Sequence, residues 1–219
     1  MSVHLQREFD NLKKHLLSLC ALVEDQVEAA VRALMDRDEE LARRVEARDS
    51  EIDHREVEVE EECLKTLALY QPVANDLRFV VAALKINNDL ERIGDLAVNV
   101  ARKALNVARE ERIEIPFDLP GMWQKTQGML RDSIDALVNL DGPLANKVCA
   151  RDSEVDQMKR ENRRKAEAIF QEDPRRAPVI LNLLAVSRNL ERIADHATNI
   201  AEDVIYLVEG RIIRHGGGE

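Results

Sequence analysis

The sequence LERIGDLAVNVA, from Leu90 to Ala101, returns as LERIADHATNIA from Leu190 to Ala201, and eight of the twelve positions are identical. A second pair of motifs precedes it in each half. ARDSEID at 47–53 and ARDSEVD at 150–156 agree at six of seven positions. Two motifs in the same order, about 100 residues apart, indicate a duplicated structural unit.

Apolar residues recur with the period of an α-helix around these motifs. From Leu5 to Leu34 they are spaced three or four residues apart, which predicts a helix of about 30 residues. Aromatic residues make up only 3% of the chain, and no alternating strand pattern appears. The sequence therefore predicts an all-α protein of two tandem, pseudo-symmetric three-helix bundles with six long antiparallel helices. The later helices are expected over 39–70, with a bend near 48–50, and over 73–109, 123–140, 144–172 and from after 174 to about 209.

Prolines and glycines predict where one half ends and the next begins. The segment 113–121, IEIPFDLPG, holds two of the six prolines and a glycine, which is typical of a linker. The expected organisation is a first bundle over 1–112, a linker over 113–121, a second bundle over 122–210 and a flexible tail over 211–219.

Bulk composition excludes several classes of function. A net charge of −10 disfavours nucleic-acid binding, which needs a basic surface. Cys20, Cys63 and Cys149 form no CxxC motif, which argues against a disulfide framework or a zinc site of that kind. Neither a hydrophobic signal region nor an apolar stretch long enough to cross a bilayer is present. We expect a cytoplasmic protein without direct membrane insertion.

Each repeated motif contains two carboxylates four residues apart, so both point from one face of a helix. On the third and sixth helices this stripe lies opposite the apolar stripe. Successive antiparallel helices bring two pairs side by side, where they repel unless a cation lies between them. Oxygen ligands favour magnesium, calcium, manganese or iron, and zinc remains open. The predicted metal ligands are Asp49, Asp53, Glu91, Asp95, Asp152, Asp156, Glu191 and Asp195, with Asn99, Asn199 and His196 as weaker candidates.

Other readings of these residues stay open at this stage. An acidic helix face is often merely solvated, and Arg92 and Arg192 then form ordinary surface ion pairs. Glu51 and His54 match part of a di-iron carboxylate motif, but His54 is not duplicated: Gln157 stands at the equivalent position. A di-iron type of enzyme or a metal-storage protein is therefore the alternative function. No nucleophile or phosphate-cradling motif is visible, so we expect no catalytic residues.

The repeated motifs, together with YQPVANDLRFVVAALK from Tyr70 to Lys85, resemble the PhoU family. The resemblance covers about residues 5–207. It implies a negative regulator of phosphate uptake and signalling that couples the ATPase subunit of a phosphate ABC transporter to a sensor histidine kinase. It also implies a homodimer and metal clusters held by E/D-x-x-x-D motifs, which match the eight carboxylates above. Departures from the repeat at Ala194, at His196 and over 173–178 imply two metal sites that differ.

Overall fold

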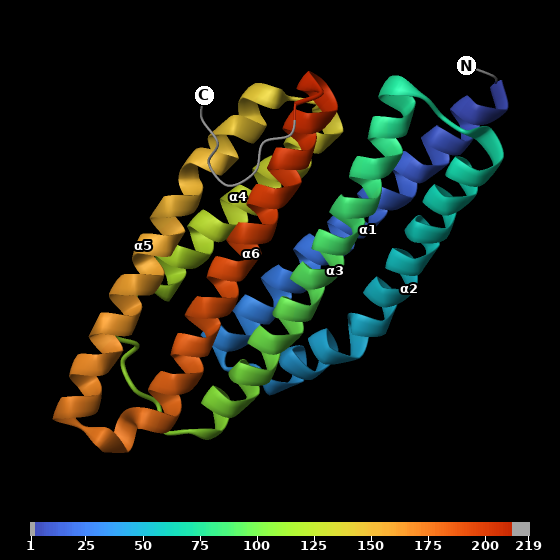
Figure 1. The fold of residues 1–219 in the computed structure, drawn as a ribbon. Helices are drawn as coiled ribbons and strands as arrows, with labels where there is room; N and C mark the ends of the chain where they lie inside the picture. Colours follow the sequence, from blue (N-terminus) through green and yellow to red (C-terminus); the bar gives the residue numbers. More distant parts are fainter. Residues whose placement is uncertain (1–2, 212–219) are drawn as a thin grey trace.

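The computed structural model describes residues 3–211, which form six long α-helices and no strand (Figure 1). The predicted all-α class and the tandem bundles are confirmed. Of the predicted flexible tail, residues 212–219 lie outside the described part of the chain. The helices are α1 (Val3–Asp36), α2 (Glu39–Tyr70), α3 (Ala74–Arg109), α4 (Leu119–Asn139), α5 (Gly142–Glu172) and α6 (Ala177–Glu209), with a 3₁₀ turn η1 (Pro174–Arg176) before α6.

Two helices begin earlier than the sequence predicted. The carboxylates of Asp118 and Asp141 each accept a hydrogen bond of 2.9 Å from the backbone N–H three residues further on, which caps the new helix. A proline follows in the first turn, where its missing N–H has no intrahelical partner to lose. α4 and α5 therefore start at Leu119 and Gly142 rather than near 123 and 144, and the last three residues of the expected linker 113–121 belong to α4.

The bend expected near residues 48–50 does not interrupt α2. The residues from Glu39 to Tyr70 form one continuous helix. Figure 1 shows that the helix nevertheless changes direction in its first, light-blue part. A curved but unbroken helix keeps every backbone hydrogen bond while following the surface of its bundle.

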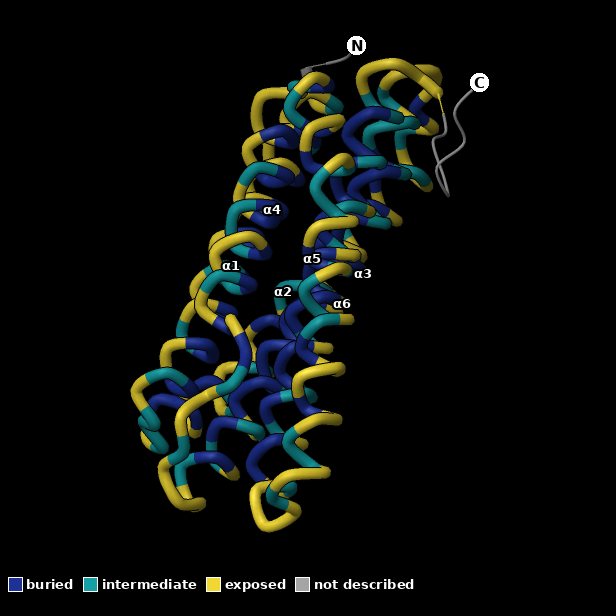
Figure 2. The backbone as a smooth tube through the Cα atoms, turned by 90° about the vertical axis from the view of Figure 1, so that its left-hand side faces the viewer, coloured by how far each residue is buried: buried dark blue, intermediate teal, exposed yellow. Residues whose placement is uncertain are grey.

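The two bundles lie side by side, with α3 and α6 in the middle and α2 and α5 on the outer flanks (Figure 1). α1, α2 and α3 pack against one another, as do α4, α5 and α6, and α3 makes its most extensive contact with α6. Buried residues line the inside of both bundles along their full length (Figure 2). The duplicated helices thus form the centre of the molecule.

Polar contacts fix the register between α3 and α6. Lys85 Nζ lies 2.7 Å from Asp203 Oδ1, and His196 Nδ1 lies 2.7 Å from Asp89 Oδ1. Asn199 Nδ2 donates a hydrogen bond of 3.1 Å to the same Asp89 oxygen. Asp89 is only 8% exposed, so its buried carboxyl group needs these hydrogen-bond partners from the other bundle. Sliding one bundle along the other would leave buried polar groups without partners.

The close approach of α2 and α3 depends on Gly94. A Cβ atom at this position would lie 3.1 Å from Cδ1 and 3.2 Å from Cγ2 of Ile52, which is buried and β-branched. At the equivalent positions of the second half stand Ala194 and the smaller Val155. In the second half, Ala194 adds a methyl group relative to Gly94, and Val155 has one carbon fewer than Ile52. The total side-chain volume at this contact is therefore similar in the two halves.

We predict that Gly94→Ala and Ile52→Val compensate each other. Alanine gains helix propensity but overpacks against Ile52, and valine removes Cδ1, the nearer of the two contacting carbons. The double variant should be more stable than the sum of the single effects by about 1 kcal/mol. Urea denaturation of the wild type, both single variants and the double variant measures this coupling. Additive effects, within about 0.3 kcal/mol, would show that the backbone adjusts instead.

Candidate metal-binding faces

The first acidic face is built by α2 and α3. Asp49 and Asp53 lie on α2, near enough to Glu91 and Asp95 of α3 for their charges to interact. Partial burial, followed by the charges of Asp53 and Asp95, raises the pKa of Asp49. The pKa of Glu91 is also raised, by partial burial first and then by Asp95, with smaller contributions from Glu56 and Asp53. The two pairs predicted from spacing therefore lie within each other's electrostatic influence.

The second acidic face repeats this arrangement on α5 and α6. Partial burial raises the pKa of Asp152, partly offset by a hydrogen bond of 3.3 Å from Thr198 Oγ1. The pKa of Asp195 is raised to about 6, although the residue is exposed. Desolvation of its carboxyl group contributes most, followed by the charges of Glu191, Asp152 and Asp156. Each face thus carries four carboxylates on two helices, close enough for some of their charges to interact.

Basic side chains neutralise part of each face. On the first, Arg92 Nε lies 3.4 Å from Glu91 Oε2, and Arg92 Nη1 lies 3.3 Å from Asp95 Oδ2. On the second, Lys159 Nζ hydrogen-bonds to Glu191 and lies 3.4 Å from Asp156 Oδ1. Desolvation lowers the pKa of Lys159, but the bonds and charges of Glu191 and Asp156 outweigh it and raise the pKa overall. Lys159 is thus a cation that bridges α5 and α6 within the face.

The two faces carry opposite charges at one pair of equivalent positions, which lies just outside the repeated motifs. Three residues after the end of each seven-residue ARDSE motif, the first half has Glu56 and the second half has Lys159. The side chain of Asn87, which is 1% exposed, donates a hydrogen bond of 3.2 Å to Glu56 Oε1. Extending the alignment of ARDSEID and ARDSEVD by three residues reveals this charge reversal. The first face gains a fifth carboxylate where the second carries an ammonium group.

Two of the weaker candidates, His196 and Asn199, are engaged by the other bundle. His196 and Asn199 both contact Asp89 of the other bundle, as described above. Asn99 is half-buried on α3. His54 is exposed on α2, with Nε2 3.4 Å from Glu58 Oε1. His196 and Asn199 are therefore already engaged between the bundles, and neither is directed at the second acidic face.

The donor set fits a hard cation, but the side chains are not gathered around one point. Across residues 3–211, no three histidine, cysteine, aspartate or glutamate side chains are placed so that they could hold a metal ion. The pKa values of Asp49 and Glu91 are raised first by partial burial and then by neighbouring carboxylates, and Arg102 and Arg92 offset part of these shifts.

Comparisons with known proteins show which family the chain belongs to. The PhoU domain model matches it twice, over residues 16–104 and 119–204. The chain belongs to the PhoU family. A relative named phosphate-specific transport system accessory protein PhoU homolog, from Pseudomonas aeruginosa, is 39% identical over 99% of this chain and 90% of its own length. The protein named phosphate-specific transport system accessory protein PhoU in Escherichia coli K12 is 32% identical over 100% of this chain and 91% of its own length.

Solved PhoU structures share the fold. The crystal structure of PhoU from Pseudomonas aeruginosa matches with a TM-score of 0.91 and 40% identity, covering 94% of this chain and 99% of that one. The phosphate transport system regulatory protein PhoU from Streptococcus pneumoniae matches with a TM-score of 0.86 and 27% identity, covering 96% and 100%. PhoU is a family of accessory regulatory proteins, which confirms the prediction of a protein that is not an enzyme.

None of the helices described between residues 3 and 211 is both long and apolar enough to cross a bilayer. Burial raises the pKa of the Cys20 and Cys63 thiols to about 12, so neither is a thiolate nucleophile at neutral pH.

We predict that Asp195→Asn changes how stability depends on pH. The folded-state pKa of about 6 lies above the ordinary value of 3.8, so the ionised carboxylate destabilises the folded state. This penalty is absent at low pH and develops as pH rises through the window from about 4 to 6. In buffer with a chelator, the variant should therefore unfold at higher urea concentration than the wild type at about pH 7.5, with the difference shrinking toward about pH 4.5. Asp10→Asn, on an exposed stretch of α1, is the control, and a pH-independent difference for Asp195→Asn would contradict the assignment.

Proposed function

We propose that this protein is a cytoplasmic negative regulator of phosphate uptake and phosphate signalling. It couples the ATPase subunit of a phosphate ABC transporter to a sensor histidine kinase. The similarity of the entire chain to proteins named as phosphate-specific transport accessory proteins supports this proposal above all. Long exposed helix faces suit docking between two partners, and a homodimer is part of the proposal.

We further propose that metal ions bind the acidic faces. Asp49, Asp53, Glu91 and Asp95 would hold the ion on the first face, with Glu56 beside them. The equivalent set on the second face is Asp152, Asp156, Glu191 and Asp195. Iron, zinc, manganese and magnesium are the candidate ions, and such an ion neutralises the carboxylates and offers open positions to an anionic group. An ion bound on either face would link the two helices that carry its ligands, α2 with α3 or α5 with α6.

The two faces do not need a cation equally. The first concentrates Glu56 with the repeated pairs and has Arg92 at its edge. In the second, Lys159 already bonds to Glu191 and lies near Asp156. A metal ion must displace this ammonium group, which costs binding free energy. The first face is therefore the stronger metal site in this proposal.

Location on the surface argues against the enzymatic alternative. Asp53 and Asp195 are exposed and Asp49, Glu91, Asp95 are half-buried, whereas oxygen activation at two irons requires a closed site. Nothing in the structure favours metal storage over regulation.

Neutralising the first face should release phosphate repression. We predict that Asp49→Asn/Asp53→Asn/Glu91→Gln/Asp95→Asn raises a phosphate-starvation reporter about fivefold or more in phosphate-rich medium, because coupling between sites is typically of this size. The measurement uses a strain lacking its own PhoU, complemented with each variant. Glu40→Gln/Glu167→Gln removes exposed carboxylates elsewhere and should repress normally. Full repression by the first variant would assign the acidic face no regulatory role.

Exchanging the charges at the two equivalent positions should invert the order of the metal sites. Glu56→Lys should weaken Mn²⁺ binding at the first face, and Lys159→Glu should strengthen it at the second, each by about tenfold for a charge reversal. Isothermal titration calorimetry, with elemental analysis of the loaded protein, measures affinity and stoichiometry. Lys147→Glu, on an exposed part of α5, is the matched control. Equal affinities in all four proteins would show that Mn²⁺ binds elsewhere.

A further inference from the structure

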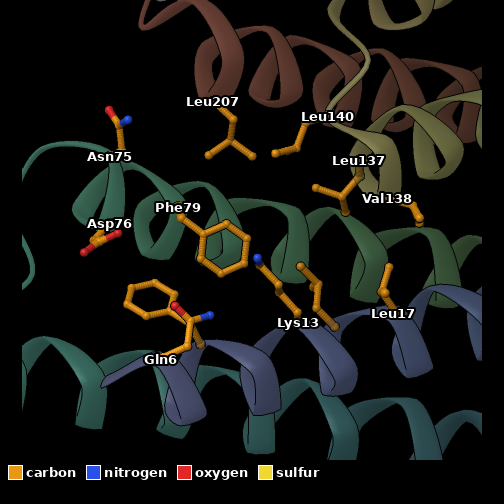
Figure 3. A pocket seen from close by; sticks show the side chains of 12 residues that line it. Gln6, Lys13, Leu17, Asn75, Asp76, Phe79, Leu137, Val138, Leu140 and Leu207 are labelled. Atoms are coloured by element: carbon orange, nitrogen blue, oxygen red, sulfur yellow. The ribbon is translucent and has the colours of Figure 1, made fainter. Parts of the chain in front are cut away.

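An apolar groove lies where the two bundles meet, at the end of the molecule that holds the starts of α1 and α3 and the ends of α4 and α6 (Figure 3). Its volume is about 340 Å³, within the range of binding sites in proteins. Four helices contribute to it, so it exists only because the bundles associate. Its apolar lining includes Phe9, Leu16, Phe79, Leu137, Val138 and Leu207.

The apolar surface of the groove continues onto its rim. Leu17 is 37% exposed, Val138 is 51% exposed and Leu140 is 52% exposed, and all three line the groove. Burying these side chains is not needed to form either bundle. Contiguous exposed apolar surface around a concave site is typical of a surface that binds another molecule.

A single ammonium group lies in the middle of this apolar surface. Lys13 Nζ is 5.3 Å from the centre of the Phe79 ring, a cation–π contact, and Figure 3 shows it between α1 and α3 beside that ring. No carboxylate in the described range 3–211 forms an ion pair with Lys13. Lys13 is exposed in the free protein, and covering the groove would desolvate its ammonium group without a carboxylate to balance it.

The other polar groups of the groove have partners or lie at its end. Gln6 Nε2 donates a hydrogen bond of 3.0 Å to Asp10, and Asn75 accepts one from Arg78. Asp76 lies in the first turn of α3, where the helix dipole favours a negative charge. Figure 3 shows Asn75 and Asp76 together at one end of the groove, away from Leu137 and Val138. The unbalanced charge in the middle is thus the positive charge of Lys13.

We propose that this groove binds an amphipathic α-helix of a protein partner. The bound helix buries apolar side chains spaced three and four residues apart against Phe79, Leu137 and Val138. Between them it carries an aspartate or glutamate that pairs with Lys13. The inference rests on the proposed function only in that the occupant is a protein. Charge complementarity sets its chemistry, since a basic helix would place a second cation beside Lys13.

A display library of helix-forming peptides of about four turns, randomised on one face, tests the groove without knowledge of the partner. The library is selected on the full protein. Selected peptides are then labelled and titrated by fluorescence anisotropy against four variants. Val138→Glu places a charge on the rim, and Leu64→Glu is its matched control, because Leu64 is 53% exposed on α2 and does not line the groove. Lys13→Glu reverses the central charge, and Lys14→Glu is the control next to it.

The expected result is an enriched acidic residue flanked by apolar residues at helical spacing. Val138→Glu and Lys13→Glu should weaken binding of these peptides by at least about tenfold, with Leu64→Glu and Lys14→Glu unchanged. Replacing the acidic residue by lysine should restore binding to Lys13→Glu. Enriched peptides without an acidic residue, or binding insensitive to Val138→Glu, would overturn the proposal. So would sedimentation showing that Val138→Glu dissociates a dimer, which assigns the groove to a second copy. The binding assay measures only the groove. A negative result would therefore not bear on the regulatory proposal, which the repression measurement tests separately.

Discussion

The packing of α3 against α6 is the contact on which the rest of the molecule depends. Both helices carry the duplicated motif, and each also packs against the other two helices of its own bundle. The contact between α3 and α6 is polar at Asp89 and apolar along the rest of the two helices, so only one register satisfies both parts. Once this register is fixed, the acidic stripes turn away from the centre, toward α2 and α5. The same contact brings the ends of four helices together and creates the apolar groove.

The two halves share one backbone fold but differ in their side chains. Gly94 with Ile52, and Ala194 with Val155, fill comparable space by opposite choices of size. Glu56 and Lys159 differ more sharply, because a reversed charge changes what the surface attracts rather than how it packs. A helical bundle tolerates such a reversal on its outer face, where water solvates either sign. Two surfaces of one geometry can therefore acquire different affinities while the fold remains symmetric.

The candidate functional surfaces occupy different parts of the fold. The acidic faces lie along the outer helix pairs, each formed within one bundle. The groove lies at one end and needs both bundles. Burial and neighbouring carboxylates raise the pKa of Glu91 on the first face, whereas Lys13 in the groove contacts the Phe79 ring. A change in how the bundles pack would alter the groove and leave each acidic face intact.

Helical periodicity and the repeated motifs predict the six helices, the duplication and the carboxylate pairs, because periodicity is local and a spacing of four residues always places two side chains on one face of a helix. The same pattern places the starts of α4 and α5 too late, since Pro120 and Pro143 look like breaks although proline fits the first turn of a helix. Packing between the helices brings His196 to Asp89 and Lys159 to Glu191, and it forms the groove. Periodicity shows which face of a helix is apolar, but the neighbour that a polar residue meets depends on packing between helices that are distant in the chain.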